Sequence, residues 1–178
     1  MTSADSACLA AHGDATTDPA GDAAAAPLVV AVFATGVATQ LVHFAHHLGW
    51  RTVVVDPAGV PDDVAAAADT VADRLTPELV EGADVVLTDH HRDEIGPLLR
   101  DALAAEPRWV GIMGSRRHEA PHPAALRALG VDEDEIARVH RPIGLDIGSQ
   151  TPPEIALSTL AGLVADRAGR DGAFHDRR

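Results

Sequence analysis

The sequence predicts an α/β fold in which a mostly parallel β-sheet lies between two layers of helices. Short apolar runs rich in valine alternate along the chain with segments whose apolar residues recur at helical spacing. The runs are apolar at nearly every position, which is typical of parallel strands covered on both faces. With 178 residues, the chain has room for one domain with a substantial core.

The first half of the chain contains the pattern of a βαβ unit. A β-branched run at 28–33 predicts a strand, and a turn follows it directly. Segment 37–48 has apolar residues at helical spacing and ends at Gly49, a residue that favours the left-handed conformation found after helices. A second β-branched run, 51–55, ends at Asp56.

The remaining elements continue the alternation of strands and helices. Strands are expected at 83–88 and 109–113, and helices at 94–104 and 154–165. The alanine- and aspartate-rich stretch 58–80 predicts a loop with one short helix or edge strand.

Local signals mark the element boundaries in the last third of the chain. The glycine and serine at 114–115 end the strand before them. The motif TPPE at 151–154 is a capping box with proline at the first helical position, and it predicts the start of the last helix. Pro121 and Pro123, which flank His122 after His118, predict a loop or an interrupted helix.

Composition and charge limit the class of protein. The net charge of −13 argues against a broad electrostatic surface for nucleic acid or anionic lipid. The single cysteine, Cys8, excludes a disulfide framework, and no secretory signal or membrane-length apolar run is present. We expect a cytoplasmic protein with a disordered tail at 1–26, a folded domain at 27–168 and a polar tail at 169–178.

A strand, a glycine turn, a helix, a strand and an acidic residue follow one another in the order of a nucleotide-binding βαβ unit, so the fold is expected to be Rossmann-like. The glycine pattern is incomplete, because Ala34 stands in the place of the first glycine, beside Thr35 and Gly36. Asp56 would accept hydrogen bonds from a ribose 2′-hydroxyl and disfavour an NADP-type ligand. The alternative is a Rossmann-like scaffold that binds no dinucleotide.

Two further polar segments are candidates for the site. Asp89 and His90 follow a predicted strand, at the carboxyl edge where parallel sheets place ligand groups. Gly114, Ser115, Arg116 and Arg117 begin a segment that can bind an anion or a nucleotide, or can form a charged cap.

Two further features are a glycine-rich turn after these segments and a group of histidines before them. Gly144, Asp146 and Gly148 can orient polar groups of a ligand or only fix a turn. His43 and its neighbours at 46–47 have a spacing that places two imidazoles on one helix face. They lack the glutamate of a zinc-protease helix, so we assign no metal site and expect solvated histidines.

Three segments together resemble a known family. WVGIMGSRR at 109–117, RVHRPIGLDIG at 138–148 and TPPEIALSTLAGLV at 151–164 are similar to the C-terminal domain of the XdhC/CoxI proteins. These are accessory factors of xanthine dehydrogenase and related molybdenum hydroxylases. The resemblance spans about 28–168 and implies a Rossmann-type domain that binds molybdenum cofactor, helps it receive its terminal sulfur and hands it to an apo-hydroxylase.

The family motifs fall on particular positions of this chain. The motif G-S-R-R falls on 114–117, P-I-G-L-D-I-G on 142–148 and T-P-x-E-I-A on 151–156, while the polar segment after the third strand falls on 88–91. The family turn G-A-G-H-V would fall on 34–38, where only Gly36 matches.

The resemblance also implies partners. The expected partners are a molybdenum hydroxylase apo-enzyme and a cysteine desulfurase. Family members resemble two-domain proteins whose N-terminal domain carries cysteines, so a separately encoded N-terminal domain is another candidate, and a homodimer stays open. Two other functions remain as alternatives. One is an NAD-dependent oxidoreductase with Asp89 or His90 as its acid or base, and the other is a ligand-free interaction module.

Overall fold

The computed structural model describes residues 26–115 and 120–174. Within these ranges the chain forms one six-stranded sheet with the strand order β3-β2-β1-β4-β5-β6, in which every neighbouring pair is parallel. The strands are β1 (Leu28–Val32), β2 (Arg51–Val55), β3 (Thr70–Ala72), β4 (Asp84–Leu87), β5 (Trp109–Ile112) and β6 (Val139–His140).

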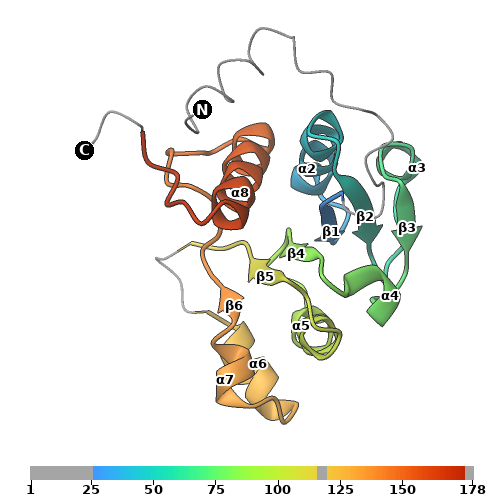
Figure 1. Cartoon of the computed structure of the whole chain (residues 1–178). Coiled ribbons are helices and arrows are strands. Elements are labelled where there is room, and N and C mark those ends of the chain that lie inside the picture. Colours follow the sequence, from blue (N-terminus) through green and yellow to red (C-terminus); the bar gives the residue numbers. More distant parts are fainter. Residues whose placement is uncertain (1–25, 116–119, 175–178) are drawn as a thin grey trace, which may run out of the picture.

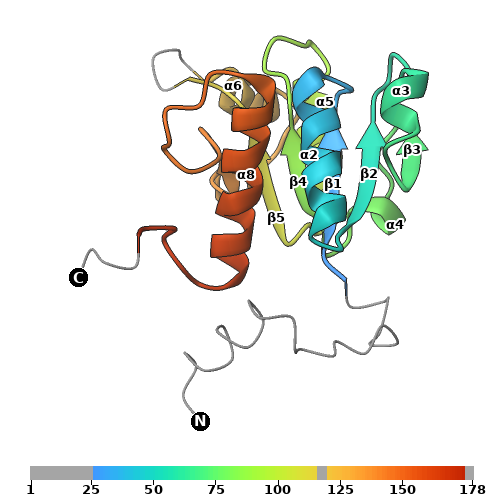
Figure 2. The ribbon, with the colours of Figure 1, turned by 90° about the horizontal axis from the view of Figure 1, so that it is seen from above.

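Helices cover both faces of the sheet (Figures 1 and 2). The helices are α2 (Gly36–His47), α3 (Asp62–Ala65), α4 (Pro77–Val80), α5 (Ile95–Ala104), α6 (His122–Ala128), α7 (Glu133–Ile136) and α8 (Pro152–Arg167). In Figure 1, α2 and α8 lie above the sheet, and α5, α6 and α7 lie below it. The predicted three-layer α/β fold with a parallel sheet is therefore confirmed.

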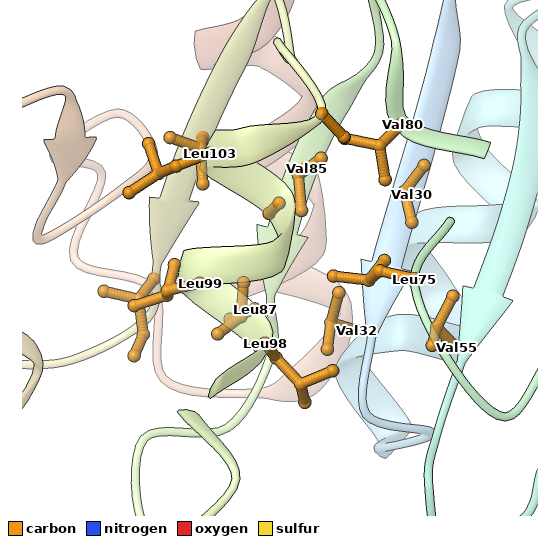
Figure 3. Close-up of a cluster of buried hydrophobic side chains, with 14 of the residues drawn as sticks. Val30, Val32, Val55, Leu75, Val80, Val85, Leu87, Leu98, Leu99 and Leu103 are labelled. Atoms are coloured by element: carbon orange, nitrogen blue, oxygen red, sulfur yellow. The ribbon is translucent and has the colours of Figure 1, made fainter. Parts of the chain in front are cut away.

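Alternate residues of the central strands feed two separate cores. On β1, Val30 and Val32 pack with α5 and its neighbours, whereas Val29 and Ala31 pack with α2 and α8. Figure 3 shows the first of these cores, in which leucines of α5 meet valines of β1, β2 and β4. Because both faces are covered, the strands need apolar residues at every position, which explains the continuous β-branched runs.

The strands and the long helices lie close to where the sequence predicts them. All the residues of α5 that the helical spacing turns inward are buried. Leu48 differs from the prediction, because it follows the end of α2 and is 53% exposed. For 58–80 the sequence predicts one short helix or edge strand, whereas the structure has two short helices and a strand there, α3, β3 and α4. The short elements α7 and β6 were not predicted, and a helix begins at His122.

The order of the strands creates a switch point between β1 and β4. From β1 the chain crosses to β2 on one side, and it later returns to β4 on the other side. Loops that leave the two strands therefore diverge at their carboxyl ends and open a crevice there. The segments after Val32 of β1 and Leu87 of β4 lie at this position. Ligand-binding residues are therefore expected in these two segments.

A buried ion network fixes the carboxyl end of α8 to the sheet. Asp84, fully buried at the start of β4, accepts hydrogen bonds from Arg108 Nε at 2.5 Å and from Arg167 Nε at 2.8 Å. Arg108 also contacts Asp166 of α8 at 2.6 Å, and the Arg167 guanidinium lies 5.0 Å from the centre of the Trp50 ring. Two arginines thus converge on one carboxylate and hold α8 in place.

Replacement of Asp84 by alanine should strongly destabilise the fold. The change leaves Arg108 and Arg167 partly buried without their shared carboxylate, and loss of one partner of a buried ion pair costs about 3–5 kcal/mol. The matched control is Asp101→Ala, which breaks an exposed pair with Arg100 and should cost at most about 1 kcal/mol. Urea unfolding of the three proteins measures both values, and equal losses would contradict the network.

Candidate functional site

A pocket of about 690 Å³ lies at the carboxyl ends of β4 and β5. Its walls come from the segments after these two strands, from the loop between β6 and α8, and from the first turns of α2 and α8. The lining residues are Val37, Thr88, His90, Met113, Gly114, Ser115, Pro142, Ile143, Gly144, Leu145, Asp146, Ile147, Gly148, Ser149, Ile155 and Ser158. The pocket therefore occupies one side of the switch-point crevice.

The structure brings together half of the residues that the sequence singles out. The site residues that line the pocket are His90, Gly114, Ser115, Gly144, Asp146 and Gly148. Those that do not line it are Thr35, Gly36, Asp56 and Asp89. Arg116 and Arg117 lie outside the described residues. Whether any of these residues binds a ligand stays a prediction.

Every residue of the loop 142–149 lines the pocket, and the loop packs directly on α8. The Leu145 amide donates a hydrogen bond to the Ser158 carbonyl at 3.0 Å. Gly144 has a φ of 86°, and a Cβ at this position would lie 2.7 Å from Ser158 Oγ. Glycine is required there both for the left-handed backbone and for the close approach to the helix.

The segment after β5 forms the opposite wall. A Cβ on Gly114 would collide with the Arg141 guanidinium, so the absence of a side chain lets Arg141 pack against this strand end. Trp109, on the same strand, stacks on His140 of β6 with ring centres 4.9 Å apart. These contacts join β5 to the chain that enters the loop wall.

Thr88 links the segment after β4 to the turn after β1. Its hydroxyl donates to the Phe33 carbonyl at 2.8 Å and accepts a hydrogen bond from Thr35 Oγ1 at 2.9 Å. Thr88 is not among the predicted site residues, although the family segment 88–91 includes it and its place directly after a strand of a parallel sheet is the same signal that selected Asp89 and His90.

Asp89 and His90 have different surroundings. Asp89 Oδ1 accepts a hydrogen bond from the His91 amide at 2.8 Å, which makes Asp89 the first residue of an Asx turn. That turn brings the His90 and His91 rings to 3.9 Å between centres. Of the two predicted residues, His90 is the one that lines the pocket.

The turn between β1 and α2 uses its own polar groups. Thr35 caps α2, since its hydroxyl accepts a hydrogen bond from the Ala38 amide at 3.2 Å. The residue in the left-handed conformation is Phe33, with a φ of 72°, and not Ala34, where the sequence comparison placed the first glycine. Gly36 is the first residue of α2 and lies beside Pro152 of α8. A Cβ added to Gly36 would lie 3.9 Å from the Pro152 side chain.

Asp56 lies at the carboxyl end of β2 with only 6% of its surface exposed. Its Oδ2 accepts a hydrogen bond from the Ala34 amide at 2.9 Å. Its Oδ1 accepts from the Ala58 amide at 2.9 Å and from Arg92 Nη2 at 3.3 Å. Both oxygens therefore stabilise the surrounding loops in this structure.

Arg92 connects Asp56 to the far end of the loop that contains His90. It also donates to both carboxylate oxygens of Glu94, at 2.8 and 3.3 Å. The hydrogen bonds to Glu94 and the charges of both carboxylates raise the pKa of Arg92 above its usual range, and the same hydrogen bonds lower the pKa of Glu94. The guanidinium lies 4.7 Å from the centre of the Phe33 ring.

The histidines of α2 serve local structure. His46 Nε2 lies 2.9 Å from Thr52 Oγ1 and 3.3 Å from a carboxylate oxygen of Asp69, while His47 Nδ1 lies 2.8 Å from the His43 carbonyl. Over 26–115 and 120–174, no three His, Cys, Asp or Glu side chains are grouped so as to hold a metal ion. In the same ranges, no helix is long and apolar enough to cross a bilayer.

Replacement of Gly144 by alanine should displace the loop wall. The left-handed backbone alone costs about 1–2 kcal/mol, and the contact with Ser158 adds to it. Gly148→Ala is the matched control, because Gly148 has a similar φ of 72° and no atom within 4 Å of its Cβ position. Chemical unfolding should show a larger loss of stability for Gly144→Ala; equal losses would contradict the close packing on α8.

His122 should make the fold sensitive to acid. The residue is 5% exposed, and its Nδ1 has no hydrogen-bond partner among residues 26–115 and 120–174. Burial, and then the charge of Arg141, lower the pKa of His122 below its ordinary value of 6.5. The unfolded chain therefore binds a proton first, and the free energy of unfolding should fall as the pH drops below about 6.5.

His122→Gln removes this contribution, so the stability of the variant should fall less than that of the wild type between pH 7.5 and 5.5. Urea unfolding at several pH values measures the difference. A variant with the same pH dependence as the wild type would contradict the role of His122.

The chain is similar in sequence to a protein family and to two bacterial proteins. The model of the XdhC Rossmann domain family matches residues 29–163. Over 90 residues the chain is 33% identical to the uncharacterized protein YqeB of Escherichia coli K12, a match that covers 51% of this chain and 16% of YqeB. Over 83 residues it is 29% identical to the molybdenum cofactor insertion chaperone PaoD of the same organism, covering 47% of this chain and 26% of PaoD.

A solved structure also resembles the chain. A crystal structure described as a xanthine dehydrogenase from Bacillus halodurans superposes with a TM-score of 0.63 and 25% identity, over 84% of this chain and 45% of that one. The chain thus spans less than half the length of each of these relatives. Because the family model matches most of the described residues, including the segments that build the pocket, the chain belongs to the XdhC Rossmann domain family.

Proposed function

We propose that the protein is an accessory factor for the maturation of a molybdenum hydroxylase of the xanthine dehydrogenase or CO dehydrogenase type, and that its pocket holds molybdenum cofactor or a nucleotide. The observation that carries the proposal is the composition of the pocket walls. Segments 113–115 and 142–149, which carry the family resemblance, meet at the carboxyl edge of the sheet, where Rossmann-type folds bind ligands. The relation to a molybdenum cofactor insertion chaperone supports the choice of ligand.

The residues present fit the polar ring and the phosphate of a pyranopterin. The pocket offers the hydroxyls of Thr88, Ser149 and Ser158, the imidazole of His90 and the carboxylate of Asp146. Apolar side chains lie among them and can pack against a flat ring. Such a set of groups binds and orients a polar heterocycle and needs no proton transfer.

The phosphate would lie near the segment that follows β5. Gly114 and Ser115 line the pocket, and Arg116 and Arg117 follow them directly in the sequence. Guanidinium groups bind phosphate through charge and through paired hydrogen bonds. We therefore assign the phosphate to the guanidiniums of Arg116 and Arg117, together with backbone amides of this segment.

The bound cofactor would supply the redox chemistry of the client hydroxylase, and the protein itself would act by binding and protecting it. The sequence has a single cysteine, Cys8, so a cysteine desulfurase is the proposed source of the terminal sulfur. The apo-hydroxylase would receive the cofactor. The proposal includes a cytoplasmic location. It also includes an N-terminal XdhC-type domain that is encoded separately and acts together with this chain.

A nicotinamide-dependent oxidoreductase is the second candidate, because His90 lines the pocket and an imidazole can transfer a proton to a carbonyl oxygen. The surroundings of Asp56 weigh against it, since both of its carboxylate oxygens already bind groups of the protein. Ligand binding distinguishes the two candidates.

The ligand test is a thermal-shift series with molybdenum cofactor, CTP, GTP, NAD and NADP. A ligand at one hundred times its Kd stabilises the folded state by about 2.7 kcal/mol, which raises the melting temperature measurably. We expect a shift with molybdenum cofactor or a cytidine nucleotide. The shift should disappear in the double variant Arg116→Ala, Arg117→Ala.

The control is the double variant Arg74→Ala, Arg100→Ala, which removes two exposed arginines outside the pocket and should keep the shift. A shift with NAD alone, together with hydride transfer, would favour the oxidoreductase. No shift with any ligand would overturn the cofactor-binding proposal and leave an interaction module.

A further inference from the structure

The carboxyl edge of β1 and β2, on the other side of the switch point, differs from the pocket described above. In a dinucleotide-binding turn, backbone amides after the first strand face the pyrophosphate, and an acidic residue after the second strand binds the adenosine ribose. In this chain the acidic residue is Asp56, and the turn 33–35 precedes Gly36, which stands at the second glycine position at the start of α2. The amides of 33–35 and the carboxylate of Asp56 have hydrogen-bond partners within the protein.

Each amide of the turn donates to a protein oxygen. The Phe33 amide donates to the Val55 carbonyl at 2.7 Å, and the Thr35 amide donates to the Phe33 carbonyl at 3.0 Å. The Ala34 amide donates to Asp56 Oδ2 at 2.9 Å. These hydrogen bonds fix the turn to the carboxyl end of β2.

The Phe33 side chain also fills space that a glycine would leave open. Its ring is fully buried, and it belongs to the core between β1 and α5. The backbone at Phe33 has a positive φ, a conformation that costs about 1–2 kcal/mol for a residue with a Cβ. The turn is therefore held in this shape by the packing of Phe33 and by the hydrogen bonds around it.

Arg92 covers the remaining approach to Asp56. It contacts Asp56 Oδ1 at 3.3 Å, forms paired hydrogen bonds with Glu94 and lies on the Phe33 ring. The side chain of Arg92 is 27% exposed and that of Asp56 is 8% exposed, so the ion pair is largely buried. We call Phe33, Asp56 and Arg92 the Asp56 clamp. None of its three residues lines the pocket, to which the β1–α2 region contributes only Val37.

We infer that the Asp56 clamp is a specificity determinant that keeps the carboxylate of Asp56 from the adenosine ribose of NAD, so that the protein accepts a pterin-like or nucleotide ligand in the pocket and disfavours adenine dinucleotides such as NAD. The inference rests on the proposed function for the identity of the pocket ligand. The exclusion of adenosine has its own observations, namely the hydrogen bonds that occupy the carboxylate of Asp56 and the guanidinium of Arg92 beside it.

The test compares NAD with nicotinamide mononucleotide, which lacks the adenosine half, by isothermal titration of the full chain. In the wild type, NAD should bind no more tightly than nicotinamide mononucleotide. Arg92→Ala frees Asp56 for a ribose diol, and hydrogen bonds to a charged group should strengthen NAD binding at least about tenfold. The double variant Asp56→Asn, Arg92→Ala should lose this gain.

Two further variants control for folding and for charge. Arg92→Met removes the guanidinium and keeps an apolar chain over Phe33, so it replaces Arg92→Ala if that protein does not fold. Arg100→Ala removes an exposed arginine of α5 and should leave NAD binding at the wild-type level.

Wild-type binding of NAD tenfold or more tighter than that of nicotinamide mononucleotide would overturn the inference. The absence of any gain in a folded Arg92 variant would overturn it as well. Titration of the same proteins with molybdenum cofactor tests the proposed function separately, so either idea can fail while the other stands.

Discussion

Burial of the central strands on both faces is the constraint on which the rest of the structure depends. On β1, Val30 and Val32 pack toward α5, whereas Val29 and Ala31 pack toward α2 and α8. Both faces of the strand are therefore apolar. The parallel ladders use its backbone groups. Polar chemistry is therefore confined to the strand ends, with Asp84 at the amino edge and Asp56 and Thr88 at the carboxyl edge.

The two buried aspartates have complementary structural effects. Asp84 fixes α8 through Arg167, and α8 in turn carries the loop wall of the pocket through Ser158. Asp56 fixes the first turn and, through Arg92, the loop after β4. The carboxyl edge of the sheet thus has a pocket over β4 and β5 and hydrogen-bonded protein groups over β1 and β2. The chain belongs to a Rossmann domain family and keeps only Gly36 of the family's glycine turn.

Long, regular elements could be predicted from the sequence because each carries its own periodic signal. The strand at 28–33, the inward face of α5 and the TPPE start of α8 are examples. β6 could not be predicted, because a two-residue strand has no periodicity and is defined only by its pairing with β5. The left-handed conformation of Phe33 in the first turn was not predicted, since an apolar residue gives no local sign of a positive φ.

The sequence by itself determined the fold class, the order of the long elements and the segments at which polar groups could gather, because strand and helix periods are local properties of the chain. Only the tertiary structure decided which of those groups share a pocket. It brought His90, Gly114 and Asp146 together, and it engaged Asp56 with Ala34 and Arg92. The physical reason is that a carboxylate near the end of a strand has the same local pattern whether its partner is a ligand or an arginine 36 residues away.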